Sequence, residues 1–106
     1  MPAGAQSLCT APVPPPPLNG AHATAEQVRG AIASARGFIG KANLYESCLK
    51  DEMRADQVRA AALGGGSGAA PDKETQVRIA ANRRLRDKVS QDAAAALDAY
   101  KKAHAD

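Results

Sequence analysis

The fold is decided by residues 24–63, which read TAEQVRGAIASARGFIGKANLYESCLKDEMRADQVRAAAL. Nearly all of these residues are good helix formers. At about 100° per residue the charged side chains fall away from one apolar side of such a helix. That apolar stripe consists of Val28, Ala31, Ile32, Ala35, Phe38, Ile39, Ala42, Tyr45, Leu49 and Met53. Residues 24–63 therefore predict a long amphipathic helix that packs against a partner helix.

Local signals define the two ends of this helix. Thr24 and Gln27 fit a capping box, in which each side chain bonds the backbone N–H of the other residue. Gly64 suits the left-handed position that follows a helix. The Gly-rich stretch 64–71 lacks the Gly-Lys-Ser/Thr sequence of a nucleotide-binding loop, and we interpret it as a connection. Asp72 then predicts the N-cap of a second helix over residues 72–104.

The second helix has an apolar stripe of its own with three-four spacing. It runs through Ile79, Asn82, Leu85, Val89, Ala93, Ala96, Tyr100 and Ala103. A short connection makes the two helices antiparallel, which places Leu49 opposite Leu85 and Ala42 opposite Ala93. Asn82 lies within the stripe, where a polar residue fixes the register of a coiled coil. The predicted fold class is all-α: an antiparallel, coiled-coil-like two-helix hairpin over residues 24–106, preceded by an extended Pro-rich arm within residues 1–23.

The arm contains TAPVPPPPLNG at residues 10–20, which favours an extended polyproline-II conformation. Asn19-Gly20 adds a turn signal before the helix. Residues 12–15 formally satisfy the pattern of a ligand for an aromatic groove of the SH3 or WW kind. The alternative is a stiff spacer or an arm that packs on the hairpin, with Leu8, Val13 and Leu18 as its apolar contacts.

A reach estimate favours the packing arm. The fifteen steps from Cys9 to Thr24 span about 46 Å in polyproline II, and the 24 steps from Thr24 to Cys48 span about 36 Å along a helix. The arm is therefore long enough to double back and place Cys9 beside Cys48. A disulfide between them closes a loop of about forty residues and stabilises the fold by roughly 4 kcal/mol.

Composition argues against several classes of function. The chain has 106 residues and three aromatic residues, and its 44% hydrophobic content is mostly alanine, so we expect no deep enclosed pocket. Two cysteines and two isolated histidines offer no closed metal site, and we predict no metal or cofactor. No apolar run approaches the roughly 20 residues of a membrane span. The acidic run Glu46, Asp51, Glu52 and Asp56 is interleaved with basic residues, which indicates helical ion pairs and not catalytic carboxylates. We predict that the protein is not an enzyme.

The net charge of +3 comes with both signs interspersed, and the strongest charge feature lies around residues 82–88 of the second helix. The cations of this basic cluster are Arg78, Arg83, Arg84, Arg86 and Lys88. A basic helix face contacts nucleic-acid phosphates or an anionic membrane in some proteins. Here the cations are spread around the helix and have acidic neighbours, so we interpret them as a solvated, salt-bridged face. A nucleic-acid-binding helical protein is kept as the alternative function.

The N-terminal residues bear on the compartment. Ala3-Gly4-Ala5 matches the small-x-small end of a secretory signal, with cleavage before Gln6 and Met1 as an added residue. Export to the periplasm or the exterior is consistent with a disulfide. The alternative is a cytoplasmic protein with a native Met1 and two free thiols.

The AGA sequence, the cysteine beside a Pro-rich arm and the helical Tyr45-x-x-Cys48-Leu49 together resemble small, uncharacterised exported helical proteins of bacteria. The resemblance implies an extracytoplasmic location and a disulfide, and it carries no activity. We therefore expect a non-enzymatic protein-interaction or envelope-associated module. Two helices do not fully cover each other's stripes, so a protein partner or self-association, for instance as a homodimer, is expected.

Overall fold

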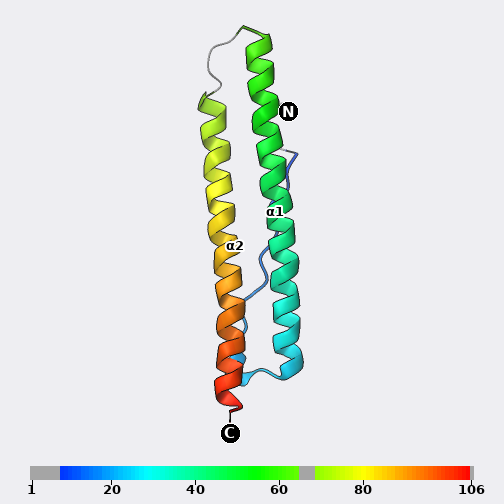
Figure 1. Ribbon diagram of the computed structural model, residues 1–106, viewed down its shortest axis with the longest axis vertical. Helices are drawn as coiled ribbons and strands as arrows, with labels where there is room; N and C mark the ends of the chain where they lie inside the picture. The colour runs from blue at the N-terminus through cyan, green and yellow to red at the C-terminus, as the bar shows by residue number, and fades with distance from the viewer. Residues whose placement is uncertain (1–7, 65–68, 106) are drawn as a thin grey trace.

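Two antiparallel helices form the body of the protein. The computed structural model describes residues 8–64 and 69–105, with the backbone alone at 69–72. Helix α1 spans Ala25–Ala62 and helix α2 spans Ala69–Ala103. A 3₁₀ turn, η2, spans Gly20–His22, and no strand occurs in the described part of the chain. The helices lie side by side in a rod 69 Å long (Figure 1), which confirms the predicted all-α hairpin.

Helix α1 begins and ends where the local signals predict. The Gln27 amide donates to Thr24 Oγ1 at 3.1 Å, and the Thr24 amide donates to Gln27 Oε1 at 2.9 Å, so the capping box is complete. At the other end Leu63 is the C-cap, and Gly64 follows it with a φ of +71°. Glycine accepts this left-handed conformation without the steric cost that a Cβ carries.

Helix α2 begins three residues earlier than predicted, at Ala69 instead of Asp72. The prediction that Asp72 is the N-cap is therefore wrong. Pro71 lies within the first helical turn, where its missing N–H has no intrahelical partner in any case and its fixed φ suits a helix. The Gly-rich residues 65–68, which the sequence predicts as a connection, lie outside the described residues.

The core lies between the two helices and combines small with large side chains. Its buried members on the helices are Val28, Ala35, Phe38, Ala42, Leu49, Ile79, Val89 and Ala96. All of them belong to the two predicted stripes. Alanines at three of these positions allow the helix backbones to approach closely, and Phe38 fills the space beside them.

The register of the hairpin differs from the predicted one. Asn82 Nδ2 donates to the Ala42 carbonyl oxygen at 2.8 Å, and Arg86 Nη1 donates to Asn43 Oδ1 at 2.9 Å. Ala42 thus faces the region of residues 82–86, and the predicted pairing of Ala42 with Ala93 is wrong by about two to three helical turns. The early start of α2 accounts for part of this shift, because each position of α1 then faces a lower-numbered residue of α2. Asn82 is 6% exposed, so its side-chain bond fixes this register from inside the core.

Residues 8–24 run back along the hairpin from the start of α1. In Figure 1 this segment passes behind both helices, so the view looks onto the face that it leaves free. Asn19 caps the 3₁₀ turn by accepting a bond from the Ala21 amide at Oδ1, at 3.2 Å. A Cβ on Gly20 would lie 1.8 Å from the Ala96 carbonyl oxygen, which shows how closely the chain passes α2. Only glycine fits at that crossing.

Candidate interaction surface

The arm, residues 8–19, is attached to the middle of α1 at its first described residues. The sulfur atoms of Cys9 and Cys48 lie 1.96 Å apart in a disulfide, with 5.7 Å between the Cα atoms, in agreement with the reach estimate. The Leu8 amide donates to Glu52 Oε2 at 2.8 Å. The Ala3-Gly4-Ala5 sequence and Gln6, on which the predicted signal remnant rests, lie outside the described residues.

Burial along the arm repeats every three residues. Cys9, Pro12, Pro15 and Leu18 are half-buried, and the residues between them are exposed. Three residues per turn is the repeat of polyproline II, so one edge of the arm faces the helices along its whole length. The predicted apolar contacts Leu8 and Val13 are wrong, with exposures of 91% and 87%, because both fall on the outward edge of this repeat.

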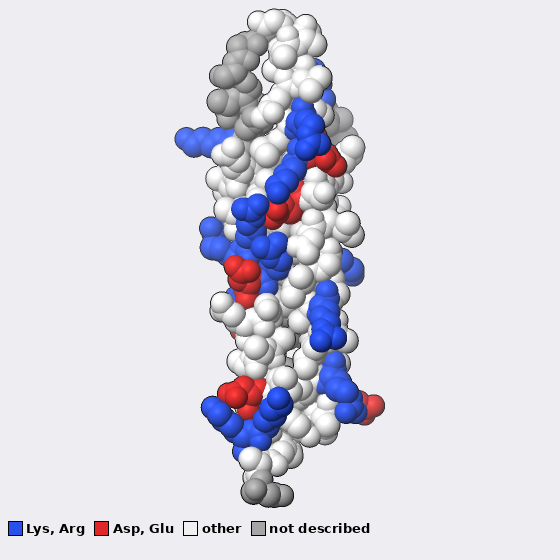
Figure 2. Space-filling model, viewed as in Figure 1, with Lys and Arg blue, Asp and Glu red and all other residues white. Residues whose placement is uncertain are grey.

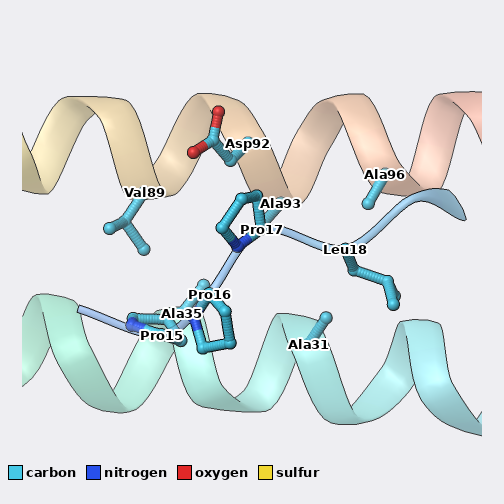
Figure 3. A pocket seen from close by; sticks show the side chains of 10 residues that line it. All are labelled: Pro15, Pro16, Pro17, Leu18, Ala31, Ala35, Val89, Asp92, Ala93 and Ala96. Carbon is cyan, nitrogen blue, oxygen red and sulfur yellow. The ribbon is translucent and has the colours of Figure 1, made fainter.

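The proline run of the arm fills the groove between the helices on one face of the hairpin. Figure 3 shows Pro15 and Pro16 over α1 and Pro17 over α2, with Leu18 reaching between Ala31 and Ala96. The cavity that remains measures about 20 Å³, roughly the space of one water molecule. We call this the covered groove. The arm thus lies against both helices and not along a flank of α1 alone.

The opposite face of the hairpin has a second groove, which the arm does not reach. Its volume is about 250 Å³. Its lining residues are Ile32, Ala35, Arg36, Ile39, Ser90, Ala93, Ala94 and Leu97. We call this the open groove. Ile32, Ile39 and Leu97 are only half-buried, although the sequence places both isoleucines in the core stripe. The stripe of α1 is thus wider than α2 covers.

Beyond one end of the open groove the helices are joined by an ion network around Glu46. Arg83 donates to its two carboxylate oxygens at 2.8 and 3.0 Å, and Lys50 lies 3.0 Å away. These bonds, chiefly the one from Arg83 and then that from Lys50, lower the pKa of Glu46 to about 2. Glu46 follows Ile39 by seven residues and lies on nearly the same side of α1. A carboxylate so firmly ionised suits a structural role and not that of a general acid at neutral pH.

Most cations of the predicted basic cluster are engaged in ion pairs. Arg78 pairs with Glu74 at 3.2 Å and Lys88 with Asp92 at 2.7 Å. Arg83 and Arg86 both lie against Glu46, at 2.8 and 3.9 Å. Arg84 alone among the five has no ion-pair partner within the described ranges. The structure therefore does not gather these cations into one free patch, and their contact with a polyanion stays a prediction.

The predicted acidic run is likewise distributed among ion pairs. Arg54 pairs with Asp51 at 3.2 Å and Arg59 with Asp56 at 3.0 Å. Within residues 8–64 and 69–105 no group of three or more histidine, cysteine or acidic side chains is placed to hold a metal ion. Nor does either helix, over its described residues, combine the length and apolar character that crossing a bilayer requires.

Arg36 is the charged residue of the open groove, and sequence reasoning missed it, as it missed Ser90 and Ala94. The sequence places Arg36 off the apolar stripe, yet it lines the groove and, within the described part of the chain, has no ion-pair partner. The available signal was its spacing: Arg36 lies four residues after Ile32 and three before Ile39, on the edge of the same side of the helix.

Comparison of the chain with protein-family models, with curated proteins and with solved structures finds no match.

Proposed function

We propose that the protein is an extracytoplasmic, non-enzymatic interaction module whose docking surface is the open groove. The observation that carries the proposal is the unequal treatment of the two grooves. One is filled by the chain's own arm down to about 20 Å³, whereas the other keeps about 250 Å³ beside half-buried aliphatic side chains. An apolar groove left uncovered on a small helical protein is typical of a binding surface.

The disulfide supports the compartment in this proposal. A Cys9–Cys48 bond that holds the arm in place suits an oxidising environment such as the periplasm or the exterior. The resemblance to small exported bacterial proteins points the same way. Nucleic-acid binding through the basic cluster is less well supported, because four of its five cations already have carboxylate partners.

Site-specific photo-cross-linking in the native host tests the docking surface. A photoreactive residue replaces Ala94, which lines the open groove, or Ala95, an exposed neighbour that lines neither groove. We expect a discrete adduct from position 94 alone, abolished by Ile39→Glu. No adduct at position 94, or equal adducts at both positions, would contradict the proposal.

The compartment is tested separately by intact mass and thiol titration of protein taken from the native host under alkylating, non-reducing conditions. A chain without free thiols that starts near Gln6 is expected. Two titratable thiols on a full-length cytoplasmic chain would overturn export while leaving the groove proposal to its own test.

A further inference from the structure

We infer that the open groove binds an amphipathic helix of a partner protein whose apolar stripe is flanked by acidic residues. This inference rests on the proposed function and names the class of partner. It is carried by two properties of the groove, its shape and the charge along its edges.

The shape of the open groove suits a helix. Its α2 side has a floor of three small residues, Ser90, Ala93 and Ala94, with Leu97 at one end. Ile32 and Ile39 line the α1 side. It runs between two antiparallel helices and is lined over residues 32–39 and 90–97, about 10 Å of helix length. A third helix that lowers large aliphatic side chains onto this small-residue floor would pack as in a three-helix arrangement.

The edges of the open groove carry cations that have no ion-pair partner among the described residues. Arg36 lines it, Arg29 precedes Arg36 by seven residues on the same side of α1, and Lys101 follows Ala94 by seven on the same side of α2. Within residues 8–64 and 69–105 none of these three cations has an ion-pair partner. Figure 2, which looks onto this face, shows an uncharged band in its lower half, with Lys and Arg side chains on both sides of it and acidic side chains beside some of them.

Charge and shape together separate three possible occupants. A second copy that presented the same face would bring the basic edges of both copies together, and like charges at an interface oppose binding. An anionic bilayer would match the charge, but surface insertion relies on protruding apolar side chains, and Ile32, Ile39 and Leu97 line a hollow in a half-buried state. An acid-flanked helix matches both the hollow and the cations.

Two synthetic helical peptides of about 21 residues provide the test, since this length covers the groove with margin. They share leucines at three-four spacing and carry either glutamates or lysines at the flanking positions, with equal helicity checked by circular dichroism. Binding to the oxidised full chain is measured by fluorescence anisotropy at low salt and at about 0.15 M salt. We expect the acidic peptide to bind at least about tenfold more tightly than the basic one.

Two matched variants assign that binding to the groove. Arg36→Glu is expected to weaken binding of the acidic peptide by about three- to tenfold, and the loss of affinity should be smaller at higher salt. Arg84→Glu makes the same charge change at another exposed arginine without an ion-pair partner in the described residues, about half a turn round α2 from Ala93, and is expected to change nothing.

Several outcomes would overturn the inference. Equal binding of both peptides, no binding of the acidic one, or insensitivity to Arg36→Glu each contradict it. Binding to phosphatidylglycerol vesicles that Arg36→Glu abolishes would assign the groove to a membrane, and a dimer in sedimentation that Ile39→Glu dissociates would assign it to a second copy. If the acidic peptide does not bind while the photoreactive residue at position 94 still gives a cross-linked adduct, only the proposed class of partner is wrong. If position 94 gives none, the proposed function falls as well.

Discussion

The two grooves of the hairpin lie between the same pair of helices, yet one is filled by the arm and the other is open. The covered groove holds a polyproline arm with a residual cavity of about 20 Å³, and the arm is bonded covalently through Cys9. The open groove keeps about 250 Å³, and the arginine at its edge has no ion-pair partner among the residues that the structure describes. Beyond this groove the helices are joined by the Glu46 ion network. Two packed helices leave an apolar groove on each of their two faces. This chain covers one of these grooves with its own residues.

The difference teaches that the two sides depend on different forces. The covered side rests chiefly on apolar packing and a covalent bond, together with the hydrogen bond from the Leu8 amide to Glu52. The helices on the open side are joined by charge-assisted hydrogen bonds, which weaken with acid and salt. We therefore expect substitutions on the covered side to cause the larger losses of stability, and those in the Glu46 network to cause losses that depend on pH and salt.

The largest loss of stability is expected when the arm is released from the covered groove, so that both grooves are open. Replacing Cys9 and Cys48 together by alanine removes a bond that spans 39 residues of sequence and lowers the free energy of unfolding by about 4 kcal/mol. Urea denaturation measures the loss. Hydrogen exchange reports release of the arm at the Leu8 amide, which donates to Glu52, and at the Ala23 amide, which donates to the Gly20 carbonyl. Ser47→Ala, an exposed neighbour, serves as the control. A loss below about 1 kcal/mol with protected arm amides would show that packing alone holds the arm.

A smaller loss is expected from crowding the covered side. In Gly20→Ala the new Cβ meets the Ala96 carbonyl oxygen, which must move, and we expect destabilisation by about 1–3 kcal/mol. Gly37→Ala is the matched control, because a Cβ there meets nothing within 4 Å and helix propensity favours alanine by up to about 1 kcal/mol. Thermal denaturation distinguishes the two by the sign of the change in Tm. The same sign for both would mean that the crossing of arm and helix is not tight.

Acid is expected to weaken the Glu46 ion network on the open side. The pKa of Glu46 falls from 4.5 to about 2 in the folded chain, so its contribution is complete above pH 4.5 and is lost as the pH falls through about 2. Since Arg83 is half exposed, we expect a contribution of only about 1 kcal/mol. Denaturation of the native chain and of Glu46→Gln should differ at pH ~6 and converge below pH ~2. A difference that persists in acid would show that the carboxylate charge is not the cause.

The smallest effect is expected in the open groove itself. Ile39 is half-buried, so Ile39→Ala should lower the free energy of unfolding by about 1 kcal/mol or less. The same substitution at Ile79, which is 7% exposed, leaves a cavity in the core and should cost about 2–5 kcal/mol. Urea denaturation compares the two variants. Equal losses would indicate that the open groove is as well packed as the core.

The parts of the fold that could be predicted from the sequence are those set by neighbours along the chain. The capping bonds of Thr24 and Gln27 span three residues, and the left-handed turn at Gly64 depends on that residue alone. The apolar stripes follow from helical periodicity. The start of α2 was missed because Pro71 is compatible with either side of a helix boundary, and this error accounts for part of the error in the register.

The sequence of the arm contains a three-residue repeat that predicts which of its residues are half-buried. Counting in threes from Cys9 along a polyproline-II segment selects Pro12, Pro15 and Leu18, which are the half-buried residues. The apolar character of Leu8 and Val13 suggested contacts that the three-residue repeat turns outward. For the open groove, the sequence indicated only that some apolar surface remains uncovered.

By itself the sequence determined two amphipathic helices, their ends near Thr24 and Gly64, and an arm long enough to bring Cys9 to Cys48, because capping, periodicity and reach are local or additive along the chain. Only the tertiary structure decided which residues of α2 face Ala42, which of the two grooves the arm fills, and that Arg36 edges the groove left open. Those outcomes depend on the shape that both helices make together, and no single stretch of sequence contains it.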